Sequence, residues 1–310
     1  MQVGILTQTF DRPTLEETLD AVAMHGLDCV QFDMVCAGAD AMPDPTGAGV
    51  SKPAMPDRID VRVSDRIRGE MTARDITMAA VTGAFNMIHP DPQRRSNGLQ
   101  RLDELASACE RLGTSVITLC TGSRDPDIMW RWHPENDSPE AWKDLVATMS
   151  RAVEIAQEKN VTLAFEPEAN QVVGTARKSR RLLDEMQSPC LKVVMDAANL
   201  FHTGELSSSD ELSRIPEVLD EAFELLGEDI VIAHAKDVDQ QGERHVAAGK
   251  GVLDYDRYLS LLHAAGFDGP IVLHTLEESE VAQCVAFLRG KLASLGYGSV
   301  SEVGGNRGSR

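Results

Sequence analysis

Short, largely apolar runs alternate along this chain with longer segments that have the spacing of amphipathic helices. The apolar runs lie at residues 3–8, 29–34, 76–83, 115–122, 161–168, 191–197, 230–237 and 269–276. The segments between them carry apolar residues three and four positions apart, and several end in Gly or Asn, which are common helix stops. Strands that are apolar almost throughout are typical of a parallel sheet covered by helices.

Eight strand–helix units in 310 residues predict a single closed domain of the α/β class, the parallel eight-stranded (β/α)8 TIM barrel, over residues 1–298. An open doubly wound sheet would need a glycine-rich phosphate loop after its first strand, and the stretch TQTFDRPT has no glycine. Residues 36–57, rich in Pro and Gly, predict an irregular loop that is either a lid or simply unstructured. Residues 299–310 predict a flexible tail.

The charge balance limits the partners of this protein. The chain has 49 acidic and 30 basic residues, a net charge of -19, which repels nucleic acid and anionic membranes. It has no apolar run long enough to span a bilayer and no basic-then-apolar leader. Its six cysteines are scattered without a Cys-x-x-Cys pair, as in reduced proteins. We therefore expect a cytoplasmic protein that binds neither nucleic acid nor membrane; a homo-oligomer remains open.

Four successive apolar runs end in a polar side chain. The fifth ends at Glu166, the sixth at Asp196, the seventh at His234, and the eighth reaches His274. A single carboxylate at a strand end is usually an ion-pair partner, and a single histidine is usually just hydrogen-bonded. Because neighbouring strand ends of a barrel converge on one mouth, four in succession favour a shared cavity.

Such a cavity would need a cation. Carboxylates crowded in a desolvated pocket repel one another, and a divalent metal removes that repulsion. The residues therefore predict one divalent ion held by Glu166, Asp196, His234 and His274. Mixed carboxylate and imidazole ligands suit Mn²⁺, Mg²⁺ or Co²⁺, and the second imidazole shifts the preference toward Zn²⁺.

The motifs LAFEPE, VVMDAANLFH, HAKD, GKGVLDY and GFDGPIVLH give the chain, up to about Gly296, a resemblance to a known family. It resembles the sugar-phosphate isomerase/epimerase superfamily, the xylose isomerase-like barrels, which includes ketose 3-epimerases, inosose dehydratases and apurinic-site endonucleases. In that family a Glu, an Asp, a His and a second Glu on strands five to eight hold one divalent metal. The resemblance implies Glu166, Asp196 and His234 as ligands.

The chain departs from the family pattern at two positions. His274 stands where the eighth-strand Glu is expected, with Glu277 three residues later, so either could be the fourth ligand. Many relatives have a His three residues after the sixth-strand Asp, whereas this chain has Asn199 there and His202 three residues further on. Family epimerases use two glutamates on opposite faces of the substrate, so the first departure leaves the exact reaction open.

The expected chemistry is enolisation of a carbohydrate. A metal chelated by neighbouring hydroxyl and carbonyl oxygens acidifies the adjacent C–H, and Glu166 or its neighbour Glu168 could take that proton. Lys236 has the right parity to stabilise the enediolate. Reprotonation gives isomerisation or epimerisation, and loss of a β-substituent gives elimination.

The sequence thus predicts a divalent-metal-dependent isomerase or epimerase of a sugar, keto-sugar or polyol, phosphorylated or not. A lyase or dehydratase of the same fold is the main alternative; a metal-dependent endonuclease, disfavoured by the negative charge, and a non-catalytic barrel are further ones. Residues expected to bind the small-molecule substrate are Glu168, Asn199, His202, His245 and Lys250.

Overall fold

The strands close into a ring. The computed structural model describes residues 1–38, 55–202, 205–206 and 208–296. The barrel strands are β1 (Gln2–Leu6), β2 (Cys29–Phe32), β3 (Thr77–Thr82), β4 (Val116–Leu119), β5 (Thr162–Phe165), β6 (Leu191–Asp196), β7 (Ile230–Val238) and β9 (Pro270–Leu273). Each pairs in parallel with its neighbour, and β9 joins β7 to β1. The predicted closed parallel eight-stranded barrel is confirmed.

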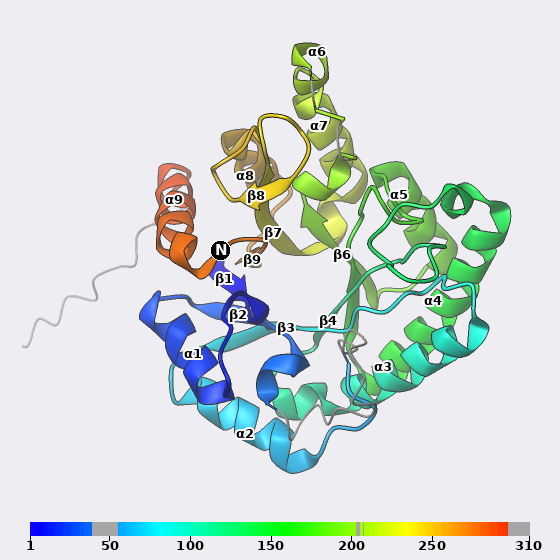
Figure 1. Cartoon of the computed structure of the whole chain (residues 1–310), viewed down its shortest axis with the longest axis vertical. Coiled ribbons are helices and arrows are strands. Elements are labelled where there is room, and N and C mark those ends of the chain that lie inside the picture. Colours follow the sequence, from blue (N-terminus) through cyan, green and yellow to red (C-terminus); the bar gives the residue numbers. More distant parts are fainter. Residues whose placement is uncertain (39–54, 203–204, 207, 297–310) are drawn as a thin grey trace, which may run out of the picture.

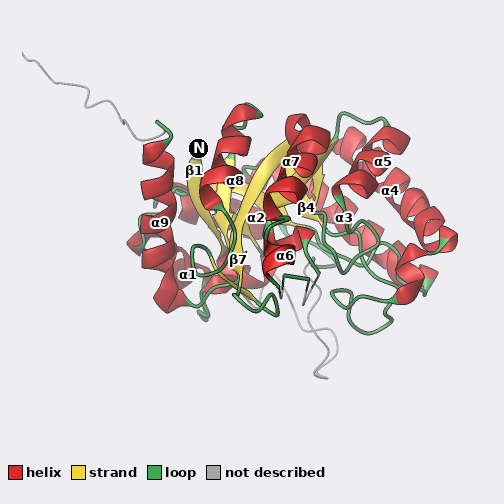
Figure 2. Ribbon diagram, turned by 90° about the horizontal axis from the view of Figure 1, so that it is seen from above, coloured by secondary structure: helices red, strands yellow, loops and turns green. Residues whose placement is uncertain are grey.

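Helices surround the strands on the outside (Figures 1 and 2). They are α1 (Leu15–Met24), α2 (Val61–Thr72), α3 (Pro92–Leu112), α4 (Pro139–Lys159), α5 (Ala176–Met186), α6 (Ser209–Leu212), α7 (Ile215–Leu226), α8 (Tyr255–Ala264) and α9 (Val281–Ser294). Local sequence sets several of their ends. The side chains of Thr14 and Ser138 accept first-turn N–H groups of α1 and α4, and α4 ends at Asn160 in the left-handed region. Within the described ranges, no helix is both long and apolar enough to cross a membrane.

The barrel interior is filled by small apolar side chains beneath a polar layer. One buried group draws one residue from each of five strands: Ala80, Ala164, Val194, Ile232 and Val272. Because side chains alternate along a strand, the residues two positions further on point to the same inner side. Those residues are Thr82, Glu166, Asp196, His234 and His274. The predicted metal ligands thus form the layer next to these apolar side chains, at the carboxyl ends of the strands.

A ninth strand, absent from the sequence-based expectation, lies outside the ring. β8 (His245–Ala247) pairs antiparallel with the end of β7. Asp237 holds this hairpin, since its carboxylate accepts the N–H groups of Gly249 and Leu253 at 3.2 and 3.0 Å. Residue 251 has to be glycine, because the backbone of Val238 passes so close that a Cβ at this position would lie 1.9 Å from its carbonyl oxygen. Asp237 therefore caps the turn of this hairpin.

Two predictions fall largely on residues outside the described ranges. Most of the predicted lid at 36–57, and all of the predicted tail at 299–310, lie there. At the lid's edge, Met55 is buried and lines the cavity described below. All six cysteines are free thiols.

Candidate metal centre and active site

A cavity of about 750 Å³ opens at the carboxyl ends of the barrel strands. The predicted residues that line it are Glu166, Glu168, Asn199, His234, Lys236, His245 and His274. They come from β5, from the turn after β6, from the β7–β8 hairpin and from the end of β9. This is the end of the barrel where the sequence places its polar strand ends, and the structure brings these seven side chains to one cavity.

The four predicted metal ligands form a compact cluster. Glu166, Asp196, His234 and His274 each offer one ligand atom, and these atoms all lie within 4.8 Å of one another. His274 Nε2 lies 2.8 Å from Asp196 Oδ2. His234 Nδ1 lies 3.2 Å from Glu166 Oε1 and 3.8 Å from Asp196 Oδ2. Four side chains from four strands therefore point at one small volume.

The protonation states of this cluster suit a cation. Burial works to raise the pKa of Asp196, but Lys236 and the hydrogen bond from His274 outweigh it, so this pKa falls below its usual value. Burial also opposes ionisation of Glu166, and His234 outweighs it, so the pKa of Glu166 is lowered as well. Burial and then Lys236 lower the pKa of His274, although its hydrogen bond with Asp196 works to raise it. Carboxylate and imidazole side chains together are a donor set that divalent cations accept.

A hydrogen-bonded chain runs along one side of the cluster. Lys236 Nζ donates to Asn199 Oδ1, and Asn199 Nδ2 donates to Glu166 Oε1 at 2.6 Å. Lys236 Nζ also lies 3.4 Å from Asp196 Oδ2. Asn199 reaches this position because a 3-10 turn, Ala198–Leu200, follows β6 directly, and Asp196 Oδ1 fixes it by accepting the N–H of Ala198. The ammonium is thus buried beside two carboxylates, which offsets the cost of burying its charge.

Glu168 stands apart from the other carboxylates. It follows Glu166 by two residues, lines the cavity, and accepts a hydrogen bond from Gln171 Nε2 at 3.0 Å. Burial and repulsion from Glu166 raise the pKa of Glu168 to about 8. The two neighbouring glutamates therefore face the same space with different proton affinities.

Two predicted substrate-binding residues are not brought to the cavity. His202 is exposed and follows the buried Phe201. In the 3-10 turn after β6 it is Asn199, and not His202, that is directed toward the cavity. Lys250 is exposed and its ammonium pairs with Glu280 at 2.6 Å. Neither residue is among those that line the cavity.

The eighth strand of the barrel, β9, is followed directly by His274, and His274 is the side chain that this strand contributes to the cluster. Glu277 is exposed and sits at the start of a short 3-10 turn, where it forms a capping box with Glu280. Its side chain accepts a backbone N–H of that turn instead of facing the cavity. The geometry therefore supports His274 over Glu277 as the fourth side chain of the centre.

The sequence-based analysis missed part of the opposite wall of the cavity, the residues contributed by β2 and by the turn after β3. It includes Gln31 and Asp33, which follow the inward parity of β2, and Phe85 after β3. Trp130, on the loop after β4, also lines it and is 48% exposed. The polar residues alternating in CVQFDM were an available signal, because Gln31 and Asp33 share one side of that strand.

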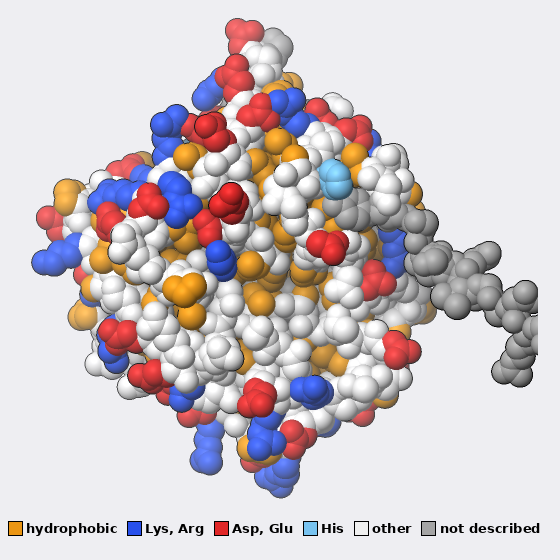
Figure 3. Space-filling model, turned by 180° about the vertical axis from the view of Figure 1, so that it is seen from behind, with side chains coloured by type: hydrophobic (Ala, Val, Ile, Leu, Met, Phe, Trp, Pro, Cys, Tyr) orange, Lys and Arg blue, Asp and Glu red, His pale blue; other side chains and the backbone are white. Residues whose placement is uncertain are grey.

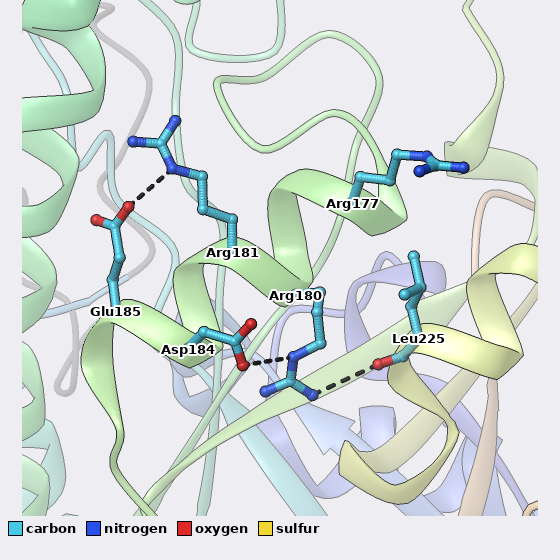
Figure 4. Close-up of a pocket in the computed structure, with 6 residues that line it drawn as sticks. All are labelled: Arg177, Arg180, Arg181, Asp184, Glu185 and Leu225. Carbon is cyan, nitrogen blue, oxygen red and sulfur yellow. Dashed lines mark hydrogen bonds and ion pairs between the residues drawn. The ribbon is translucent and has the colours of Figure 1, made fainter.

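A second, smaller hollow of about 400 Å³ lies between α5 and α7 (Figure 4). Its arginines are compensated: Arg180 pairs with Asp184 at 2.9 Å and Arg181 with Glu185 at 2.8 Å, while Arg177 pairs with Glu221. Seen from behind, the molecule likewise shows acidic and basic side chains interspersed (Figure 3). Because each arginine is paired with a carboxylate, the hollow has no unpaired arginine that would attract an anion.

Comparison with known proteins agrees with this geometry. L-ribulose-5-phosphate 3-epimerase UlaE of Shigella flexneri serotype 5b (strain 8401) is 23% identical over 218 residues, which cover 68% of this chain and 70% of the relative. A solved D-tagatose 3-epimerase-like protein superposes with a TM-score of 0.70 at 16% identity, covering 96% of this chain and 98% of its own.

A second solved structure, the IolI protein with a bound zinc atom, superposes with a TM-score of 0.67 at 16% identity. The superposition covers 95% of this chain and 99% of that one. The family model described as xylose isomerase-like TIM barrel matches residues 19–291, which is most of the chain. This protein therefore belongs to the xylose isomerase-like TIM barrel family.

Proposed function

We propose that this chain is a divalent-metal-dependent isomerase or epimerase of a sugar, keto-sugar or polyol. The observation that carries the proposal is the convergence of two carboxylates and two imidazoles within 4.8 Å inside a cavity of about 750 Å³. That volume suits a monosaccharide, phosphorylated or not. The names of the relatives support it, since UlaE and the tagatose 3-epimerase-like protein are named as epimerases.

In this proposal Glu166, Asp196, His234 and His274 hold the metal, as the bound zinc of IolI also suggests. A divalent ion there would polarise neighbouring oxygens of the substrate and acidify the C–H beside its carbonyl group. Mn²⁺, Mg²⁺, Co²⁺ and Zn²⁺ all accept this donor set.

The chain's own groups would move the proton. Glu166 takes the proton from the carbon next to the carbonyl, and the electron pair of that C–H bond passes into the enediolate of the substrate. Lys236 faces the cavity beside Glu166 and Asn199, so its ammonium stabilises the charge on the substrate oxygen. Return of the proton to the neighbouring carbon gives an isomer, and return to the opposite face gives an epimer.

Epimerisation needs a second proton donor across the substrate. The family's second glutamate is His274 in this chain, so that donor has to come from another residue. Glu168 and His245 line the same cavity and carry groups that can donate a proton. We propose Glu168 first, because Gln171 holds its carboxylate in place.

Solvent exchange tests this function. The protein, loaded in turn with Mn²⁺, Co²⁺, Mg²⁺ and Zn²⁺, is incubated in D₂O with free and phosphorylated ketoses, and NMR follows deuterium at the carbon beside the carbonyl. We expect deuterium in an isomer or epimer of one of these sugars. Glu166→Gln should slow the reaction by about 10²–10⁴-fold, whereas Glu277→Gln should leave it unchanged. An unsaturated product would instead show the lyase alternative, and full activity in Glu166→Gln would contradict the proposed base.

A further inference from the structure

We propose that the cavity favours a sugar that carries an aromatic substituent, and that Trp130 binds this substituent. The inference rests on the proposed function for the sugar end of the substrate, which would lie at the metal centre. It goes further in assigning the rest of the cavity to a flat apolar group and in naming the residue that selects for it. The favoured substrate class is then a sugar linked through a glycosidic oxygen to an aromatic ring.

The cavity has two unlike sides. The proposed metal ligands come from β5, β6, β7 and the end of β9. The turns after β3 and β4 carry a run of apolar side chains, which we call the apolar side: Phe85, Cys120, Ile128, Met129 and Trp130. The hydroxyl groups of a sugar would lose their hydrogen bonds to water against such side chains. A ligand that contacts both sides of this one cavity therefore needs a polar part and an apolar part.

The buried polar groups next to the apolar side are used within the protein. The carboxylate of Asp125 accepts the N–H group of Ile128 at 2.8 Å and pairs with Arg131 at 3.0 Å. The Asn86 side chain donates to the carbonyl oxygen of Ser123 at 2.7 Å and accepts the N–H group of the same residue at 3.2 Å. Asp125 and Asn86 both line the cavity, but these contacts hold the loop after β4. An apolar substituent suits this wall better than a second sugar ring, which would need free hydrogen-bonding groups.

The other charged side chains on this side of the cavity do not make an anion site. Arg101 pairs with Asp57 at 2.6 Å. Arg94 and Asp127 are exposed and carry opposite charges. This side therefore offers no net positive charge that would favour a phosphate group on the substrate.

Exposed apolar side chains concentrate on the loop after β4. Of the five large apolar side chains that are exposed on the described part of the chain, three lie in residues 128–132: Ile128 at 42%, Trp130 at 48% and Trp132 at 47%. Ile128 and Trp130 line the cavity, whereas Trp132 is not among the residues that line it. Single exposed apolar residues are normal, but a cluster of them at a cavity is typical of a binding site.

The turn that carries Trp130 is held at both ends. The N–H group of Arg131 donates to the carbonyl oxygen of Ile128 at 3.0 Å, which closes a turn around Met129 and Trp130. Ser123 Oγ donates to the carbonyl oxygen of Arg131 at 2.6 Å. An aromatic ring on a fixed turn loses little conformational freedom when it binds a ligand.

Phe85 supplies a second aromatic ring to the apolar side. A Cβ at Gly98, inside α3, would overlap the Phe85 ring. Glycine inside a helix is destabilising, and room for this ring accounts for its presence here. The helix thus leaves space for an aromatic ring at the cavity wall.

Two glucosides test the inference. Phenyl β-D-glucopyranoside and methyl β-D-glucopyranoside share one sugar and differ only in the substituent. Each is titrated into the protein in the presence of Zn²⁺, and ¹H–¹⁵N NMR follows the indole N–H signals of the three tryptophans. Trp130→Phe and Trp132→Phe identify two of these signals by their loss. Trp130 is exposed, so its replacement should leave the fold intact, and thermal unfolding checks this.

We expect the phenyl glucoside to shift the Trp130 signal and to bind about 10-fold more tightly than the methyl glucoside, which corresponds to about 1.4 kcal/mol. The Trp132 signal should stay in place. Trp130→Ala should remove most of the preference for the phenyl glucoside, and Trp130→Phe, which keeps a ring, should retain most of it. Trp132→Ala is the matched control, because Trp132 is equally exposed on the same loop and does not line the cavity.

Failure of the phenyl glucoside to bind, equal dissociation constants for the two glucosides, or an unchanged preference in Trp130→Ala would overturn the inference. So would a Trp130 signal that moves with protein concentration without a glucoside, because the apolar side would then contact a second copy of the chain. The titration needs no turnover. A protein that shows the preference but forms no isomer or epimer of any sugar would contradict the proposed function and leave the role of Trp130 standing.

Discussion

At the scale of single residues, the site holds backbone strain next to a proposed ligand. Thr275 has a φ of 57°, in the left-handed region that a β-branched side chain rarely occupies. Its Oγ1 lies 3.1 Å from Nδ1 of His274, the nitrogen that faces away from Asp196. Strained residues persist where the surrounding structure determines them, often beside functional groups. At Thr275 the strained backbone thus coincides with a contact to His274.

Thr275→Gly should therefore stabilise the fold. Glycine adopts a positive φ without strain, and the exposed Thr275 side chain loses little packing, so we expect the free energy of unfolding to rise by about 1 kcal/mol. Urea denaturation measures this change. Thr77→Gly is the control, since Thr77 lies exposed in the extended strand β3 and its replacement should destabilise by a similar amount. A loss of stability in both variants would contradict the strain at Thr275.

Asp33, on the cavity wall, should give the stability a measurable pH dependence. Burial raises its pKa to about 6, despite hydrogen bonds from Val35 and Gln8. The folded state thus holds this proton more tightly than the unfolded chain, so the contribution of Asp33 to stability falls as the pH rises from about 4 to about 6 and stays low above that.

Asp33→Asn removes this titration. Relative to the wild type, the variant should gain about 3 kcal/mol in unfolding free energy between about pH 3.5 and pH 7, which corresponds to about two pKa units. Urea denaturation at a series of pH values gives the difference between the two proteins, in which the other titrating groups cancel. A difference that does not change with pH would show that Asp33 has an ordinary pKa.

At the scale of elements, the sequence predicted the strands and the inward positions, but not every connection. The alternation that places Ala164 below Glu166 and Val194 below Asp196 holds in the structure, because a buried strand has a strict period of two. β8 was missed because a strand of three residues is too short to show a periodic pattern. Its pairing depends on the Asp237 carboxylate, which accepts a backbone N–H group of the hairpin. His202 was misplaced because the turn after β6 breaks the strand period. The contact between Gln31 and His234 could not be predicted, because the two residues lie 203 positions apart in the sequence.

The β7–β8 hairpin should depend on Asp237. Its carboxylate accepts the N–H groups of Val238, Gly249 and Leu253, and Asp237→Ala would remove this acceptor from all three, two of which belong to buried residues. We expect the unfolding free energy to fall by about 3 kcal/mol, and amide exchange at residues 246–248 to accelerate. Asp268→Ala is the control, because that side chain is 83% exposed and pairs with the N-terminus. Equal effects of the two substitutions would rule out the anchoring role.

At the scale of the whole molecule, the barrel does what no local segment can. The four proposed ligands come from β5, β6, β7 and the end of β9, and the closed ring brings their atoms within 4.8 Å of one another. The parity of each strand end was legible in the sequence, which is why the cluster could be predicted. The sequence did not show whether His274 or Glu277 belongs to the cluster. That choice depends on how the chain turns after Leu273, at the end of β9.

Metal stoichiometry tests the central claim most directly. Chelator-stripped protein is titrated with Mn²⁺, Co²⁺ and Zn²⁺ in a calorimeter, beside Asp196→Ala and Glu277→Ala. We predict one divalent ion per chain in the wild type and in Glu277→Ala. In Asp196→Ala the affinity should fall by more than the roughly 100-fold that loss of an outer partner can cause. A wild type that takes up none of these ions, or an Asp196→Ala variant that binds them as tightly as the wild type, would contradict the metal centre.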